Sequence, residues 1–163
     1  MRRGFSLVEL VIVVVIVGFI AAIAVPRLSE ASSRASERSF ARNLRVFSDA
    51  IALYYAENPS ASLLPDTDTG EMPSDLEPYL DSRIWEQVTP LGGAWDHEHN
   101  DAPFEAGLGV SYEESGIDER HMQTVDRLID DGDLATGSFQ RAEEGARYSR
   151  YYFDVTPNLS QAR

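Results

Sequence analysis

Glu9 is an isolated carboxylate in a run of apolar residues from Phe5 to Val25, in which Ser6 is the only other polar side chain. A charged side chain costs roughly 3 kcal/mol at the centre of a membrane and less near a helix end. Such residues therefore usually have a partner or a task. A positively charged group would neutralise the carboxylate; the alternative is a side chain that snorkels to the lipid headgroups.

Three aspartates surround a glycine late in the chain, at Asp130, Asp131 and Asp133, with Thr136 nearby. Carboxylate oxygens on a flexible turn are ligands that Ca²⁺ prefers, although the spacing is not that of an EF-hand loop. These residues are therefore candidate ligands for a structural calcium ion, although a run of acids in so acidic a chain is more commonly a solvated surface. The alternative is a group of solvated acids at the end of a helix.

His97 and His99 alternate in the stretch 97–101, together with Glu98 and Asp101. Alternate side chains of a strand face the same way, so two imidazoles here could bind a transition metal. The sequence places no third strong ligand beside them. We therefore expect a polar hairpin loop rather than a metal site.

Motifs of the common enzyme classes are absent from the sequence: there is no glycine-rich phosphate loop, no G-x-S-x-G, no H-E-x-x-H and no cysteine nucleophile. We therefore expect a protein that is not an enzyme.

Five aromatic side chains could line a binding face for sugar or protein, but packing in the core is their expected use: Trp85, Trp95, Tyr148, Tyr151 and Tyr152.

The charge is distributed unevenly along the chain. Residues 58–163 contain 22 acidic residues against 7 arginines, whereas residues 1–57 contain 5 acidic residues and 7 arginines. An acidic domain repels phosphate backbones, so we expect no nucleic acid partner.

The elements that position Glu9 begin with a membrane helix. The 21 residues from Phe5 to Val25 would reach roughly 31 Å as a helix, which is the thickness of a bilayer core. Arg2 and Arg3 precede this run, so the N-terminus should stay in the cytoplasm and the remainder should face outward. A cleavable secretory signal is the alternative, but such a segment would have no use for Glu9.

The heptapeptide Gly4-Phe5-Ser6-Leu7-Val8-Glu9-Leu10, between a short basic leader and a long apolar helix, resembles the processing site of type IV pilins and type II secretion pseudopilins. The resemblance implies that a prepilin peptidase cuts between Gly4 and Phe5 and that the new amine of Phe5 is methylated. Glu9 would then pair with this amine on an adjacent subunit. Some major pseudopilins also bind a structural calcium in their C-terminal region, and the absence of cysteine favours pseudopilins over pilins closed by a disulfide.

Residues 26–57 continue the helix beyond Pro26, because apolar side chains recur at intervals of three or four residues. The apolar face consists of Leu28, Ala31, Ala35, Phe40, Leu44, Phe47, Ile51 and Tyr54. Arg34, Arg38, Arg42, Arg45, Glu30, Glu37 and Asp49 form the opposite face, which we expect to be solvated. Pro26 cannot donate to the carbonyl of Ala22, so we expect a kink or a melted turn there.

The remainder, from 58 to 163, predicts a small α+β domain. Residues 60–90 are predicted to be a loop with at most one short helix around Leu76–Leu80, and the stretch Thr89–Asp96 is predicted to be a turn that leads into a short strand. A second strand is expected at Glu105–Tyr112, with Leu108, Val110 and Tyr112 on one face, a helix at Asp118–Ile129 and a last strand at Arg147–Val155. The predicted fold class is α+β, with a long N-terminal hydrophobic helix, half transmembrane and half amphipathic, packed on a small antiparallel sheet with an extra short helix.

The sequence and the resemblance together predict four parts: a leader at 1–4, a transmembrane and assembly helix at 5–25, an amphipathic helix at 26–57 and an acidic periplasmic domain at 58–163. The expected function is that of a structural subunit of a type II secretion pseudopilus or type IV pilus-like filament. The subunit would first span the inner membrane and then enter the filament. Its partners would be other pilins or pseudopilins, the prepilin peptidase, membrane lipid and an assembly platform protein. A minor pilin that binds a ligand at the filament tip and a membrane-anchored periplasmic enzyme are the alternatives.

Overall fold

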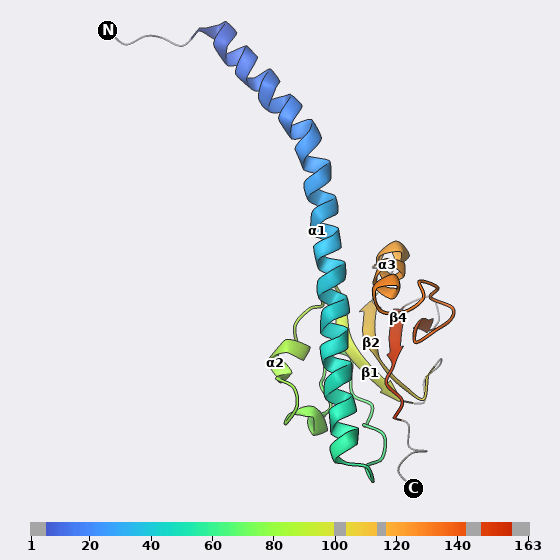
Figure 1. Cartoon of the computed structure of the whole chain (residues 1–163). Coiled ribbons are helices and arrows are strands. Elements are labelled where there is room, and N and C mark those ends of the chain that lie inside the picture. The colour runs from blue at the N-terminus through green and yellow to red at the C-terminus, as the bar shows by residue number, and fades with distance from the viewer. Residues whose placement is uncertain (1–5, 100–103, 114–116, 143–147, 158–163) are drawn as a thin grey trace. The chain divides into compact units, whose positions relative to one another are not determined.

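The structure, a computed structural model, describes residues 6–99, 104–113, 117–142 and 148–157 (Figure 1). The chain divides into two compact units, Met1–Ala35 and Ser36–Arg163. In chain order the elements are α1 (Leu7–Glu57), the 3-10 helix η1 (Ser74–Leu76), α2 (Ser82–Trp85), β1 (Ala94–His99), β2 (Ala106–Glu113), α3 (Glu119–Ile129), β3 (Phe139–Ala142) and β4 (Tyr148–Asp154). This arrangement confirms the predicted α+β, pilin-like fold.

Helix α1 continues through Pro26, so the melted turn considered from the sequence does not form. Proline removes one backbone hydrogen bond, but residues with good helix propensity lie on both sides of it. In the first unit the large apolar side chains are exposed along the whole segment that begins at Leu7 and ends at Leu28; these two side chains are 77% and 73% exposed. Ala31 and Ala35, which were expected on the buried face, are exposed as well.

The core of the second unit is built on the C-terminal half of α1. Phe40, Phe47 and Ile51 are at most 1% exposed, as the predicted apolar face requires. The ring of Phe47 stacks on Trp85 from α2 with centroids 5.2 Å apart and meets Trp95 from β1 edge-on at 4.8 Å. This part of α1 therefore lies between the segment carrying α2 and the sheet, as Figure 1 also shows.

The four strands form an antiparallel sheet in the order β1-β2-β4-β3. Trp95, Val110 and Tyr151 lie side by side in the row that faces α1. Leu108, Val110 and Tyr112 are buried on this face, which confirms the predicted alternation. Trp85, Trp95, Tyr151 and Tyr152 are also buried, so these four aromatic side chains pack in the interior instead of forming a binding surface.

On the other face of the sheet, Asp96, Gly109 and Tyr152 lie side by side across β1, β2 and β4. The phenol of Tyr152 passes over β2 and donates a hydrogen bond to Oδ2 of Asp96 at 2.7 Å, and both residues are buried. A Cβ at Gly109 would lie 2.8 Å from the Tyr152 ring and 1.8 Å from the carbonyl oxygen of Tyr151. Glycine at 109 therefore leaves room for this buried bond.

Three expectations about local structure were wrong. The short helix expected around Leu76–Leu80 is replaced by two short elements, η1, which ends at Leu76, and α2, which begins at Ser82. His97 and His99 belong to β1 and not to a hairpin loop, because their strand pairs with β2 through His99↔Ala106. Strand β3 was missed, since it has only four residues at the edge of the sheet and its hydrophobic pattern is too short to read.

Candidate assembly segment and cation site

Glu9 bonds to the start of its own helix. The backbone N–H of Ser6, which directly precedes α1, donates to Oε2 of Glu9 at 3.0 Å, and the N–H of Leu10 donates to the carbonyl of Ser6 at 3.2 Å. Ser6-Leu7-Val8-Glu9 is the Ser-x-x-Glu pattern of a capping box, in which the glutamate reaches back to the N-cap amide. The sequence carried this signal, but we did not predict the contact.

The capping contact uses only part of the carboxylate's capacity. A carboxylate has about four lone-pair positions on two oxygens, and the Ser6 amide takes one of them. A second donor can therefore approach Glu9 without breaking the cap. Gly4 and Phe5, the predicted cleavage and methylation residues, lie outside the described residues, so their pairing with Glu9 stays a prediction.

The first half of α1 is long and apolar enough to cross a membrane, by length and composition. Its large apolar side chains are about half exposed or more, for example Val11 at 48% and Phe19 at 70%. Exposed apolar surface of this extent is unfavourable in water. Such a helix fits a role in membrane anchoring.

Carboxylate oxygens from Asp126, Asp130 and Asp131 lie within 4.8 Å of one another at the end of α3. Asp126 is fully buried, and neither of its carboxylate oxygens has a hydrogen-bond partner among the described residues. Burial, followed by the nearby charges of Asp131 and Asp130, raises the pKa of Asp126 to about 6. A buried, unpaired carboxylate beside two further carboxylates is an arrangement that a cation would stabilise.

The two exposed aspartates of this group also hold the following turn. Oδ2 of Asp130 accepts from the backbone N–H groups of Ser138 and Phe139, the second at 3.3 Å. Oδ2 of Asp131 accepts from the Thr136 hydroxyl at 2.9 Å. These bonds fix the two carboxylates beside Asp126.

Asp133, the third aspartate predicted from the sequence, lies outside the group of three. Its Oδ1 accepts from the backbone N–H of Ala135 at 3.1 Å, and its own N–H donates to Oδ1 of Asp131 at 2.8 Å. The sequence analysis missed Asp126, although it lies one helical turn before Asp130 and so projects on the same side. The structure therefore brings Asp126 to the place that we had expected Asp133 to occupy.

The two strand histidines are not assembled with a third metal ligand within the part of the chain that the structure describes. His97 is fully buried, and this burial lowers its pKa to about 4. Nδ1 of His99 lies 3.3 Å from Oδ1 of Asp66. His97 is thus a core residue that stays neutral at physiological pH.

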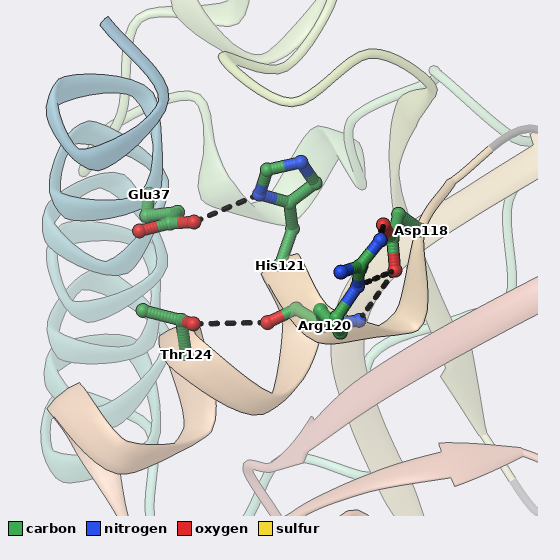
Figure 2. A network of polar contacts seen from close by, with 5 residues as sticks. All are labelled: Glu37, Asp118, Arg120, His121 and Thr124. Atoms are coloured by element: carbon green, nitrogen blue, oxygen red, sulfur yellow. Dashed lines mark hydrogen bonds and ion pairs between the residues drawn. The ribbon is translucent and has the colours of Figure 1, made fainter. Parts of the chain in front are cut away.

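Glu37, which the sequence placed on the solvated face of α1, is buried at 7% exposure. Its Oε1 lies 2.8 Å from Nδ1 of His121 on α3, as Figure 2 shows. The same view shows Arg120 donating to Asp118, the N-cap of α3, and the Thr124 hydroxyl donating to the Arg120 carbonyl at 2.9 Å. The Glu37–His121 contact ties α3 to α1, which a helical repeat alone could not reveal.

Comparison with known proteins gives one match. Residues 1–25 match the family described as the prokaryotic N-terminal methylation motif. No curated protein and no solved structure matches the chain. The matched residues contain Gly4, Phe5 and Glu9 and most of the apolar half of α1.

The motif and the α+β fold together support assignment of the chain to the type IV pilin-like proteins, the group that includes the pseudopilins. The motif supports a substrate of prepilin peptidase that assembles with other pilins, and the apolar helix that follows it fits membrane anchoring. Proteins of this type are structural, and the described residues give no positive indication of catalysis.

Proposed function

We propose that the chain is a structural subunit of a type II secretion pseudopilus or a type IV pilus-like filament. It would enter the inner membrane with its N-terminus in the cytoplasm and its acidic domain in the periplasm. Prepilin peptidase would then cut between Gly4 and Phe5, and the Phe5 amine would be methylated. The observation that carries this proposal is the methylation motif at 1–25, continuous with an exposed apolar helix.

The exposed apolar residues of α1 supply the driving force for assembly. Burial of apolar surface contributes about 25 cal/mol per Å² removed from water, and the apolar half of α1 has such surface all round. In the membrane, lipid covers this surface; in a filament, the same surface of neighbouring subunits would replace the lipid. Cleavage on the cytoplasmic side leaves the whole helix on the mature protein, as this use requires.

Glu9 would set the position of each subunit along the filament. Apolar contacts between helices are non-directional, so they do not by themselves fix the axial stagger. A charge pair between Glu9 and the Phe5 amine of a neighbour is favourable only at short range and in good geometry. The cap from Ser6 holds the Glu9 carboxylate in one orientation for that contact.

The proposal is tested by locating the epitope-tagged full chain by immunogold electron microscopy in cells with its native assembly system. A structural subunit is expected to label filaments along their length after cleavage at Gly4. Labelling confined to filament ends would instead support a minor pilin at the tip. A mature chain that remains in the membrane while filaments form without it would contradict both functions.

We also propose that Asp126, Asp130 and Asp131 bind a structural Ca²⁺. Three carboxylates converge within 4.8 Å, and the one from α3 is buried without a partner in the described part of the chain. Oxygen ligands of this kind suit a hard cation, which would neutralise Asp126 and link α3 to the turn before β3. The site would be structural, since it joins two segments of one domain.

A further inference from the structure

The solvent side of α1 carries a row of arginines. Arg27, Arg34, Arg38, Arg42 and Arg45 follow one another at spacings of seven, four, four and three residues, which places them along one side of a helix. All five are exposed, and we call them the arginine stripe.

Two members of the stripe in the globular unit, Arg38 and Arg42, are available for a partner. Arg34 pairs with Glu30 at 3.3 Å, and Arg45 donates to the carbonyl of Leu128 at 2.6 Å. Arg38 and Arg42 have no carboxylate partner in the described part of the chain, and both belong to the globular unit. Arg38 and Arg42 therefore form an unpartnered cationic part of the stripe.

The segment that joins α1 to β1 carries the opposite charge. Residues 58–93 contain seven acidic residues and one arginine, Arg83, which pairs with Asp81 at 2.6 Å. Five of these acids are exposed and contact no cationic side chain within the described residues: Asp68, Glu71, Asp75, Glu77 and Glu86. We call this set the acidic loop.

We propose that the arginine stripe of one copy docks on the acidic loop of a neighbouring copy. This inference rests on the proposed function as a filament subunit. The two charged surfaces are different parts of one chain, so their contact is head-to-tail and leaves a free stripe at one end and a free loop at the other. Such a contact repeats without closing, whereas a two-fold contact of stripe with stripe would bring like charges together.

The ion pairs would orient the subunits more than they bind them. An exposed ion pair contributes about 0.2–1 kcal/mol, so a few such pairs are small beside the apolar burial along α1. Opposite charges do accelerate association and disfavour wrong registers. The stripe and the loop thus complement the apolar helix by selecting which face of the neighbour it meets.

Cysteine cross-linking tests the contact directly, because the chain has no cysteine of its own. The full chain carrying Arg42→Cys and Asp75→Cys is expressed with its assembly system, oxidised and analysed by non-reducing gel electrophoresis. A head-to-tail contact predicts a ladder of dimers, trimers and higher multimers. Each single variant should remain monomeric, because this contact does not bring the same residue of two copies together. Arg141→Cys with Asp75→Cys is the matched control, since β3 carries Arg141 away from the stripe, and it should give no ladder.

Charge reversal provides the second measurement. Arg38→Glu with Arg42→Glu should lower the number of filaments at least tenfold, and reversing Glu71 and Asp75 to arginine in the same chain should restore them. Arg120→Gln with Arg141→Gln removes two exposed arginines outside the stripe without placing new acids beside Asp118 and Glu119, and it should leave the number of filaments unchanged. Arg38→Gln with Arg42→Gln is the matched pair in the stripe and should lower this number.

The outcomes separate this inference from the proposed function. Wild-type filaments combined with no ladder from the Arg42 and Asp75 cysteines would overturn the docking contact and leave the subunit role intact. If no ladder forms but charge reversal of the stripe still lowers the number of filaments, the stripe binds another partner. That outcome would also overturn the docking contact. A wild-type chain that joins no filament would contradict the proposed function itself.

Discussion

The backbone N–H of Ser6 donates a hydrogen bond to Oε2 of Glu9 at 3.0 Å, so the lone carboxylate of the apolar segment caps its own helix. This contact gives Glu9 a role within one chain in addition to the proposed pairing between chains. The two roles differ in what they require, because a cap needs an oxygen acceptor and a charge pair needs a negative charge.

Glu9→Gln and Glu9→Ala separate these roles. Glutamine keeps an oxygen that can accept from Ser6, whereas alanine removes both the acceptor and the charge. If the charge pair governs assembly, both variants should be cleaved normally and both should lower the number of filaments at least tenfold by electron microscopy. Normal assembly of the glutamine variant beside a defective alanine variant would assign Glu9 to capping alone.

Asp126→Asn tests the calcium site. In the wild type without Ca²⁺, the buried carboxylate and its acidic neighbours repel one another, so the neutral amide should raise the melting temperature by a few degrees, roughly 1 kcal/mol. Added Ca²⁺ should raise the melting temperature of the wild type but not of the variant. Calorimetric titration checks the same point through the heat of binding.

Asp133→Asn is the matched control for this site, because Asp133 lies outside the group of three and accepts from the backbone of Ala135. We expect this variant to keep its response to Ca²⁺. Equal loss of the response in the Asp133 and Asp126 variants would contradict the proposed set of ligands, and no response in the wild type would remove the site.

Tyr152→Phe should destabilise the domain by about 1–3 kcal/mol, because it removes the donor to a buried carboxylate oxygen of Asp96. Tyr151→Phe is a close control, since the structure gives the Tyr151 hydroxyl no hydrogen bond within the described residues. Denaturant unfolding of the full chain in detergent measures both. Equal stability of the two variants would show that the Tyr152–Asp96 bond contributes nothing.

Much of this architecture was predictable, and the failures have physical causes. Regular repeats over long segments revealed α1, β2, α3 and β4, because their periods of 3.6 and 2 are carried by many residues. The helix predicted at Leu76–Leu80 was wrong and β3 was missed, because a segment of four or five residues is too short to show a hydrophobic period. The predicted boundaries at residues 4 and 25 concern processing and the membrane, and the division of the chain into four parts stays a prediction.

The residues of the candidate sites were likewise predictable only in part. The prediction that Glu9 has a task followed from the cost of a charge in an apolar run, which is visible in the sequence, and it stays a prediction. Contacts over long sequence separations, such as Glu37 with His121, depend on tertiary packing that the sequence does not display. Asp126 was missed because an acid inside a polar helix reads as solvated until the fold buries it.

His97 gives a stability that depends on pH. Its pKa in the folded protein is about 4, below the ordinary 6.5, so between these values the unfolded chain binds a proton that the folded chain does not. Stability from this group is therefore lost as the pH falls from about 6.5 toward about 4, by up to about 3 kcal/mol at 1.4 kcal/mol per pH unit.

His97→Leu should remove this dependence. Asp126, whose pKa is raised, acts in the opposite direction over much of the same range, so the prediction concerns the difference between wild type and variant. On going from pH 7 to pH 4, the unfolding free energy of the wild type should fall relative to that of the His97→Leu variant. A constant difference across this range would show that His97 titrates normally.

The most direct test of the account is the mass of the mature N-terminus. Protein isolated from its native membrane or filament is digested, and its N-terminal peptide is sequenced by mass spectrometry. We predict a chain that begins at an N-methylated Phe5 and retains the apolar residues that follow. A mature chain that begins near Val25 would show that the apolar segment is a discarded signal, and it would contradict the proposed role in a filament.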